Sequence, residues 1–208
     1  MEIKNPGLLE MVLNGKVVYG LNQEWYHTPI KKKAGCGPAA AATLLLYMNK
    51  RENGPLGYNN SNLENAVEML DDVWRFVRPG LRGLHRAEKF AEGVRDLCGN
   101  YGLDWECRYI KVDKGASLTD VAGFIEKGLT SDCPVAFLNL HRGNATAFDS
   151  WHWIVLTGLR EENGRFIATG LDEGRIIEFD LAGWVKSTKM GGGFAYISKK
   201  TQQLPVYT

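Results

Sequence analysis

One stretch of the sequence is apolar on every side. From Gly37 onward, the residues Pro38-Ala-Ala-Ala-Ala-Thr-Leu-Leu-Leu-Tyr-Met48 favour a helix, and a proline is tolerated in a first helical turn. Because such a helix has no polar face, it is expected to lie inside the protein with other elements packed round it. Its apolar part is far shorter than the ~20 residues that a membrane-spanning helix needs. We therefore expect a soluble protein built round a central helix.

The other elements follow in two blocks, helices first and strands afterwards. Ser61-x-x-Glu64 resembles a capping box that opens a helix ending near Val77, and a second helix is expected from Leu84 to Cys98. Later segments read as an alternating strand, a capped helix and five short apolar strands: Trp105–Val112, Ser117–Leu129, Val135–Leu140, Trp153–Leu159, Phe166–Leu171, Ile176–Phe179 and Phe194–Ile197. This order favours an α+β fold with a mostly antiparallel sheet.

The length of 208 residues fits a single domain over residues 1–208. We expect an irregular N-terminal arm over residues 1–35, because glycines and prolines interrupt it repeatedly. A mainly helical half should cover residues 36–100, and a mainly β-sheet half residues 101–208.

Charge and cysteine usage narrow the function classes. The 25 basic and 24 acidic side chains nearly cancel, and the basic ones do not gather as phosphate-backbone binding requires, so nucleic acid is not an expected partner. The N-terminus lacks the basic head and apolar run of a signal peptide. The four cysteines have no metal-ligand spacing, which favours reduced thiols in a cytoplasm. No metal or organic cofactor is implied.

Cys36 is the leading candidate for a nucleophile. It stands at the start of the apolar helix, where unpaired backbone N–H groups and the helix dipole favour the thiolate. The small neighbours Gly35 and Gly37 are expected to leave room for a carbonyl substrate, and the Cys36 N–H could donate to an oxyanion. The alternative is a cysteine that only fills the core at a tight turn.

His152 is the leading candidate for the base. It lies in an apparent strand, Trp151-His152-Trp153-Ile-Val-Leu-Thr, where alternation points both tryptophans one way and the imidazole the other. A histidine on a strand is more often structural unless a nucleophile and an acid accompany it.

The choice of the carboxylate that would orient His152 depends on a predicted hairpin. Glu162-Asn163-Gly164 favours a three-residue loop with its glycine in the left-handed conformation. If the residues flanking this loop pair, Ile154 lies opposite Asp172, and His152 and Asp172 become diagonal neighbours on one face. A two-residue Asn-Gly loop would change the parity and send Asp172 to the other face. Two other acids are the fallback: Asp149 and Asp180.

These residues resemble a known family. The segments Gly35–Ala40, Trp151–Val155 and Thr169–Asp172 are similar to the Cys, His and Asp blocks of the bacterial papain-like peptidases related to bacteriocin-leader processing domains. The resemblance covers most of the chain, from about residue 23 to 198. It implies a papain-like α+β fold with its cleft between the two halves, and a cysteine peptidase or related amide hydrolase acting on a peptide or protein.

The chain departs from the family at the oxyanion side chain. The family usually has a glutamine six residues before the cysteine, where this chain has Ile30. The nearest glutamine is Gln23, which could reach the site if Tyr26 to Lys33 forms a loop and is otherwise an exposed residue of the arm.

Several alternatives stay open. The same three residues could transfer the acyl group to an amine or deamidate glutamine side chains. The chain could also be a noncatalytic peptide-binding module, for which Ile30 is the supporting feature. The run Lys31–Lys33 is expected to be solvated, and Cys98, Cys107 and Cys133 to be structural. The oligomeric state is left undetermined.

Overall fold

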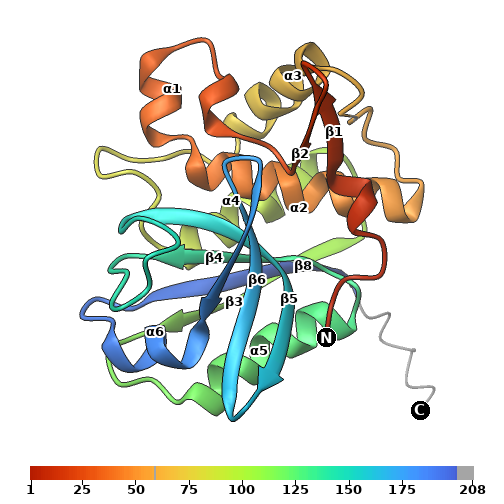
Figure 1. Ribbon diagram of the computed structural model, residues 1–208. Helices are drawn as coiled ribbons and strands as arrows, with labels where there is room; N and C mark the ends of the chain where they lie inside the picture. Colours follow the sequence, from red (N-terminus) through yellow and green to blue (C-terminus); the bar gives the residue numbers. More distant parts are fainter. Residues whose placement is uncertain (59, 201–208) are drawn as a thin grey trace, which may run out of the picture.

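The apolar stretch forms the central helix α2 (Cys36–Glu52), in which the residues from Gly37 to Asn49 are all buried. The computed structural model describes residues 1–58 and 60–200 (Figure 1). Helix α2 packs against the sheet on one side and against α3 and the N-terminal arm on others. The prediction of a central buried helix is confirmed. Within the described residues, no helix is both long and apolar enough to cross a bilayer.

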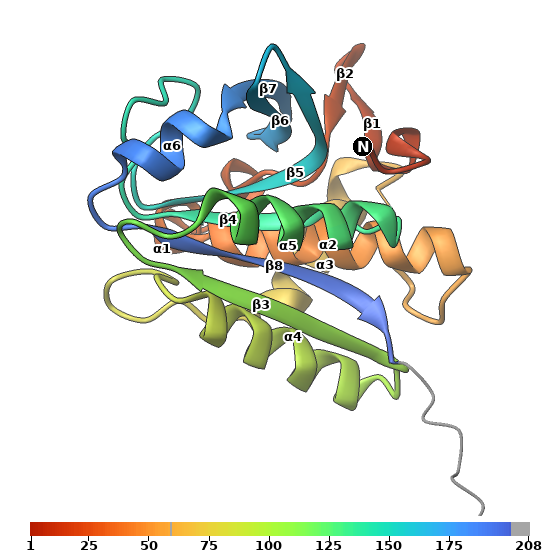
Figure 2. The ribbon, with the colours of Figure 1, turned by 90° about the horizontal axis from the view of Figure 1, so that it is seen from below.

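The fold is α+β. The described residues form six α-helices, an antiparallel sheet of six strands in the order β3-β8-β4-β5-β6-β7, and a separate two-stranded hairpin. The sheet strands are β3 (Trp105–Val112), β4 (Val135–Asn139), β5 (His152–Glu162), β6 (Arg165–Asp172), β7 (Arg175–Asp180) and β8 (Gly192–Lys199). All were expected from the sequence, with ends shifted by up to three residues. Figures 1 and 2 show α2 and α5 (Leu118–Thr130) on opposite faces of this sheet.

The helices of the first half begin slightly later than predicted. Helix α3 (Leu63–Trp74) is capped by Asn62, whose Oδ1 accepts a hydrogen bond from the Asn65 N–H at 2.8 Å. The predicted Ser61 cap is therefore wrong by one residue, because asparagine caps helices as well as serine does. Helix α4 (Ala87–Asn100) begins three residues after the predicted Leu84, whose backbone instead continues the preceding loop.

The N-terminal arm is more regular than predicted. It contains two 3-10 turns, a hairpin and a short helix: η1 (Pro6–Leu9), β1 (Glu10–Leu13), β2 (Lys16–Tyr19), η2 (Gln23–Trp25) and α1 (Pro29–Ala34). Thr28 caps α1 by accepting from the Lys31 N–H, and Pro29 occupies its first turn. The Thr-Pro pair was the signal for this helix. The helix has only six residues, which are too few to show a helical periodicity of apolar residues.

One further helix was missed. Helix α6 (Leu181–Ser187) follows β7, and Asp180 caps it by accepting from the Gly183 N–H at 3.0 Å. Its Trp184 is fully buried against Phe137 of β4. Asp180 therefore has a structural role, which removes one of the fallback acids.

Candidate functional site

Cys36 is the first residue of α2. Helix α1 ends at Ala34, and Gly35 alone joins the two helices with φ −85° and ψ −4°. The thiol is partly exposed, whereas the other three cysteines are buried. Because the first turn of a helix has free N–H groups, the sulfur lies where negative charge is favoured.

The glycines on either side of Cys36 are required by packing. A Cβ on Gly35 would lie 2.4 Å from the Lys31 carbonyl oxygen, and one on Gly37 would lie 2.7 Å from Leu84 Cδ2. These contacts give the glycines a packing role, and the expectation that they leave room for a substrate at the sulfur stays a prediction. Atoms of the protein itself occupy both positions.

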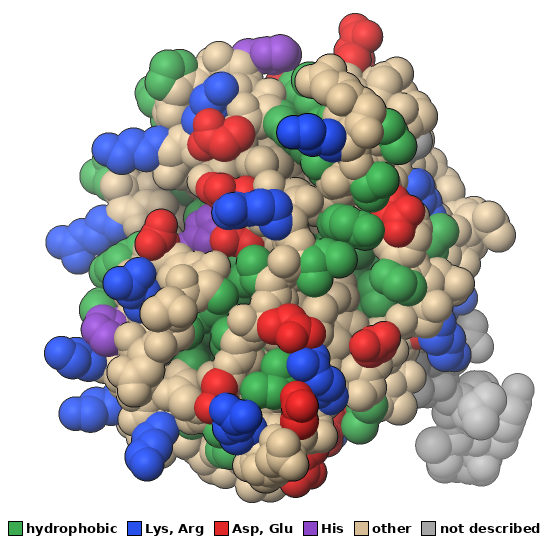
Figure 3. Space-filling model, viewed as in Figure 1, with side chains coloured by type: hydrophobic (Ala, Val, Ile, Leu, Met, Phe, Trp, Pro, Cys, Tyr) green, Lys and Arg blue, Asp and Glu red, His purple; other side chains and the backbone are tan. Residues whose placement is uncertain are grey.

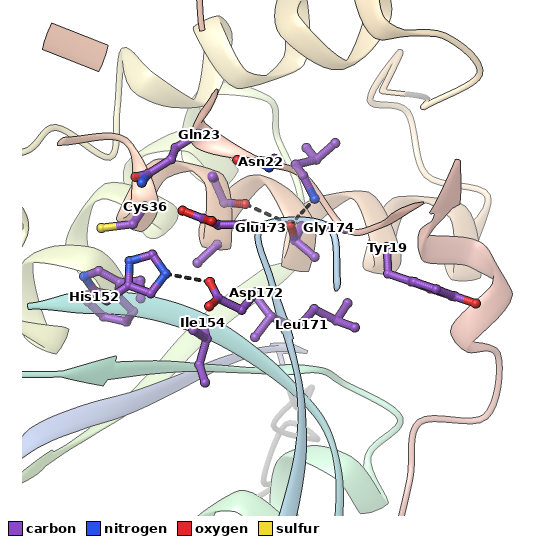
Figure 4. Close-up of a pocket in the computed structure, with 17 residues that line it drawn as sticks. Tyr19, Asn22, Gln23, Cys36, His152, Ile154, Leu171, Asp172, Glu173 and Gly174 are labelled. Atoms are coloured by element: carbon purple, nitrogen blue, oxygen red, sulfur yellow. Dashed lines mark hydrogen bonds and ion pairs between the residues drawn. The ribbon is translucent and has the colours of Figure 1, made fainter. Parts of the chain in front are cut away.

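His152 lies between Cys36 and Asp172. Its Nε2 is 2.6 Å from Asp172 Oδ1, and the Cys36 side chain lies on the other side of the ring, close enough to favour the charged imidazole. Since Asp172 takes Nε2, Nδ1 is the nitrogen that faces the sulfur. Figure 4 shows the ring between the two partners at the start of β5.

The surroundings of His152 act on its charge in opposite directions. Burial disfavours the charged ring, but the hydrogen bond to Asp172 and the nearby Cys36 side chain outweigh it and raise the pKa of His152 from 6.5 to about 10. An imidazolium ring at this position can pair with a thiolate on one side and a carboxylate on the other.

Asp172 lies on the same sheet face as His152, but the strand register near the hairpin differs from the predicted one. The hairpin loop has two residues, Asn163 and Gly164, both with positive φ, and Glu162 pairs with Arg165. The predicted three-residue loop is wrong. With the observed two-residue loop, a regular ladder would have placed Asp172 on the sheet face opposite to His152. A bulge at Thr157 adds one residue to β5 between Leu156 and Gly158, which restores the parity.

Asp172 itself begins a tight turn into β7. It pairs with Arg175, which leaves Glu173 and Gly174 as the central residues, with φ of 48° and 82°. The turn is fixed to the N-terminal arm, because the Tyr19 N–H donates to the Gly174 carbonyl at 3.0 Å. The remaining fallback acid, Asp149, points into solvent with 93% of its side chain exposed.

Gln23 lies in the same pocket as Cys36, His152 and Asp172 (Figure 4). Its Oε1 is buried and accepts no hydrogen bond from any described residue. The predicted loop from Tyr26 to Lys33 is mostly helix α1, but it still returns the chain to Cys36. Ile30 lies on that helix with 75% of its surface exposed, away from the position of an oxyanion donor.

A wide groove opens on the other side of Cys36, with a volume of about 1070 Å³. Its walls include the exposed apolar side chains of Ile30, Leu81 and Trp151. Two cations on its rim, Lys33 and Arg82, form no ion pair within the described part of the chain. Figure 3 shows lysine and arginine side chains along the left edge of this view, on the side where α1 lies in Figure 1.

The lysine run and the other cysteines have structural surroundings. Lys31 pairs with Asp71 at 2.7 Å and lies over the Tyr26 and Trp74 rings, so only part of the run is simply solvated. Burial raises the pKa of all three remaining thiols, that of Cys98 to about 11: Cys98, Cys107 and Cys133. None of these three lines the pocket or the groove.

Two residues of the site differ from the expectation: Trp151 was expected in the strand, pointing the same way as Trp153, but β5 begins at His152 and Trp151 is exposed, whereas Glu173 was not singled out at all. Trp151 immediately precedes His152, and Glu173 immediately follows Asp172; both have positive φ although neither is glycine, asparagine or aspartate. For Glu173, the signal was the segment Asp172-Glu-Gly-Arg, which can form a two-residue turn. Nothing in the sequence indicated the conformation of Trp151.

Comparison with known proteins adds no family assignment: no family model matches the chain, and no curated protein matches it.

Proposed function

We propose that the chain is a papain-like cysteine hydrolase that cleaves a peptide or a related amide through a covalent acyl-enzyme. The observation that carries this proposal is the His152 ring, which is hydrogen-bonded to Asp172 and shares a pocket with Cys36 at a helix N-terminus. A buried cysteine with only a packing role needs neither an imidazole partner nor a carboxylate behind it.

In the first half of the reaction, the Cys36 thiolate attacks the carbonyl carbon, and the electron pair of the C=O bond moves onto oxygen. The Cys36 N–H and the side-chain amide of Gln23, which lines the same pocket, would donate hydrogen bonds to this oxyanion. The C–N bond then breaks as the leaving amine takes a proton from His152, which leaves a thioester on Cys36.

In the second half, water attacks the thioester while His152 accepts its proton, and the acid product leaves Cys36. Asp172 holds the ring with Nδ1 toward the sulfur and supports its positive charge in both halves. The proposed chemistry uses side chains and water alone.

The two cavities beside Cys36 suggest how a substrate lies. The amine must depart next to His152, which lines the small pocket with Gln23 but does not line the wide groove. The groove therefore suits the acyl part, and its apolar walls suit a peptide with large apolar side chains.

Transfer of the acyl group to an amine uses the same groups, with an amine in place of water. In the deamidation of a glutamine side chain, ammonia is the amine that leaves in the first half of the reaction. These remain alternatives, and the product masses distinguish them from hydrolysis. Labelling of Cys36 distinguishes a catalytic protein from a noncatalytic binding module.

The test is labelling by a peptidyl acyloxymethyl ketone, which a thiolate attacks as it attacks a substrate. We expect labelling at Cys36, loss of labelling in Cys36→Ala, strong slowing in His152→Ala and no change in Cys98→Ala. Mass analysis of a peptide mixture incubated with the protein should then show paired hydrolysis products. Equal labelling of the wild type and His152→Ala would contradict the proposal.

A further inference from the structure

Two strained residues flank the proposed catalytic side chains. Non-glycine residues rarely adopt positive φ, except asparagine and aspartate, whose short polar side chains tolerate it. Within the described residues, four of the six such cases follow this rule: Asn14, Asn53, Asp132 and Asn163. The two exceptions are Trp151, next to His152, and Glu173, next to Asp172. Strain of this kind often marks a functional position.

Glu173 points into the proposed site. Figure 4 shows its side chain extending from the β6–β7 turn toward Cys36 and Gln23, and it lines the pocket that these residues share with His152. A turn of this type accommodates asparagine or glycine without strain, so stability alone would not favour a glutamate. The side chain is 40% exposed and remains accessible to a ligand.

The pocket offers acceptors whose hydrogen-bonding capacity is unused. The ion pair that Glu173 forms with Arg175 has an N–O distance of 3.8 Å, which is beyond hydrogen-bond distance, and the Arg175 side chain is 71% exposed. Such a loose surface pair screens the carboxylate weakly. The second acceptor is Gln23 Oε1, which is buried without a partner among the described residues. A buried acceptor of this kind is costly unless a small donor such as a water molecule reaches it.

We infer that the pocket holding Glu173 selects a positively charged group on the leaving side of the scissile bond, such as a lysine or arginine side chain directly after it. This inference rests on the proposed function and specifies its substrate class. The cation would pair with the exposed part of the Glu173 carboxylate at the mouth of the pocket, while Gln23 Nε2 donates to the oxyanion. In an acyl transfer, the same subsite would receive a cationic amine as acceptor.

A pair of small thiol reagents tests the charge without knowledge of the substrate. The 2-aminoethyl and 2-sulfonatoethyl methanethiosulfonates differ mainly in charge, and each forms a mixed disulfide with the thiolate as methanesulfinate leaves. The measured quantity is the cation-to-anion ratio, which is the second-order rate constant of the aminoethyl reagent at Cys36 divided by that of the sulfonatoethyl reagent. Both rate constants are obtained by mass spectrometry. We expect Glu173→Gln to lower the cation-to-anion ratio about three- to tenfold, as loss of a nearby charge predicts.

Two further variants control this measurement. Glu161→Gln removes the same charge from an exposed position of β5 that lines neither cavity, and should leave the ratio unchanged. Arg175→Gln removes the competing cation and should raise the ratio. Equal ratios in the wild type and Glu173→Gln would overturn the inference. If Cys36 reacts with neither reagent nor with iodoacetamide, the proposed function itself fails, and this inference with it.

Peptides complete the test. Mass analysis of cleaved peptides should show lysine or arginine enriched directly after the scissile bond, and Glu173→Gln should reduce this preference at least threefold in kcat/KM. Glu173→Asn should lose the preference too, but raise the unfolding temperature, because asparagine fits the turn. Retained preference in both variants would contradict the assignment, even if both still cleave peptides.

Discussion

His152 carries its proton well into the alkaline range because Asp172 and the nearby Cys36 side chain outweigh the effect of burial on its pKa. With a pKa of about 10, the ring is an imidazolium at neutral pH and loses its charge only as the pH passes that value. The proton is needed where the C–N bond breaks, since a leaving amine cannot depart unprotonated.

We therefore predict that the acylation rate on a cleaved peptide amide falls as the pH rises through about 10. Asp172→Asn removes a group that raises the pKa, so its alkaline limb should lie at lower pH. A p-nitrophenyl ester of the same acyl part serves as control, because its leaving group departs without a proton. Single-turnover measurements from pH 6 to 11 check this, and identical profiles for amide and ester would count against it.

Asp172 and Cys36 differ in how much the reaction depends on them. In the proposed reaction Cys36 supplies the electron pair for the new bond, whereas Asp172 orients His152 and supports its charge. The first turn of α2 presents its free backbone N–H groups to the sulfur whether or not the carboxylate is there.

Replacing Asp172 by alanine should therefore lower the rate by about 100-fold, toward the smaller end of general acid–base effects, with the fold retained. Cys36→Ala should abolish turnover. Peptide cleavage rates, with circular dichroism to verify folding, decide the comparison. Full activity in Asp172→Ala would show that another group orients the imidazole.

At the scale of elements, the start of α2 is fixed by close packing. A Cβ on Gly37 would lie 2.7 Å from Leu84 Cδ2 and 3.3 Å from Trp153 Cδ1. Neither neighbour moves freely, because Trp153 Nε1 donates to the Leu84 carbonyl at 2.6 Å and its ring stacks on Phe90. The same contacts connect the nucleophile helix, β5 and the wall of the groove.

Gly37→Ala should destabilise the fold by about 1–3 kcal/mol through this overpacking and also slow labelling of Cys36. The matched control is Gly123→Ala in α5, where an added Cβ meets no atom within 4 Å. That change should stabilise the fold by about 0.5–1 kcal/mol, since alanine favours a helix over glycine. Urea unfolding of both variants measures the effects, and equal stabilities would refute the packing argument.

The strand elements show where local patterns suffice and where they fail. The limits of β3 follow from alternation in its own sequence and match the prediction. The bulge at Thr157 has no comparable signal, because a β-branched residue there suits a regular strand equally well. The predicted pairing of Ile154 with Asp172 agrees with the observed register, although the predicted loop was wrong.

At the scale of the whole molecule, a buried polar cluster joins the arm, α2 and the loop before β4. The Tyr47 hydroxyl donates to Asp132 Oδ1 at 2.6 Å, and the same oxygen accepts from the Lys4 N–H at 2.8 Å. The Tyr47 oxygen also accepts from the Asn5 N–H at 3.3 Å. This cluster ties the N-terminal arm to the body of the protein.

Tyr47→Phe removes the hydroxyl and leaves buried polar groups short of partners, which should cost about 1–3 kcal/mol of stability. Tyr109→Phe is the control, because that ring lies beside Arg95 and its hydroxyl makes no hydrogen bond to a described residue. The control should change stability by less than about 0.5 kcal/mol. Thermal unfolding compares the two, while Cys36 labelling should be unaffected in both.

The sequence by itself determined the α+β class, the central helix and most strand positions. It did so because these depend on apolar periodicity and on residues close together in the chain. It also indicated Cys36 and His152, since a helix start and a strand are local features.

Tertiary structure alone decided how distant segments meet. The bulge sets the face of Asp172, the arm returns Gln23 to the pocket, and the β6–β7 turn directs Glu173 toward the sulfur. Each of these placements depends on packing between segments far apart in the chain. The local propensities of Thr157, Gln23 and Glu173 do not predict them.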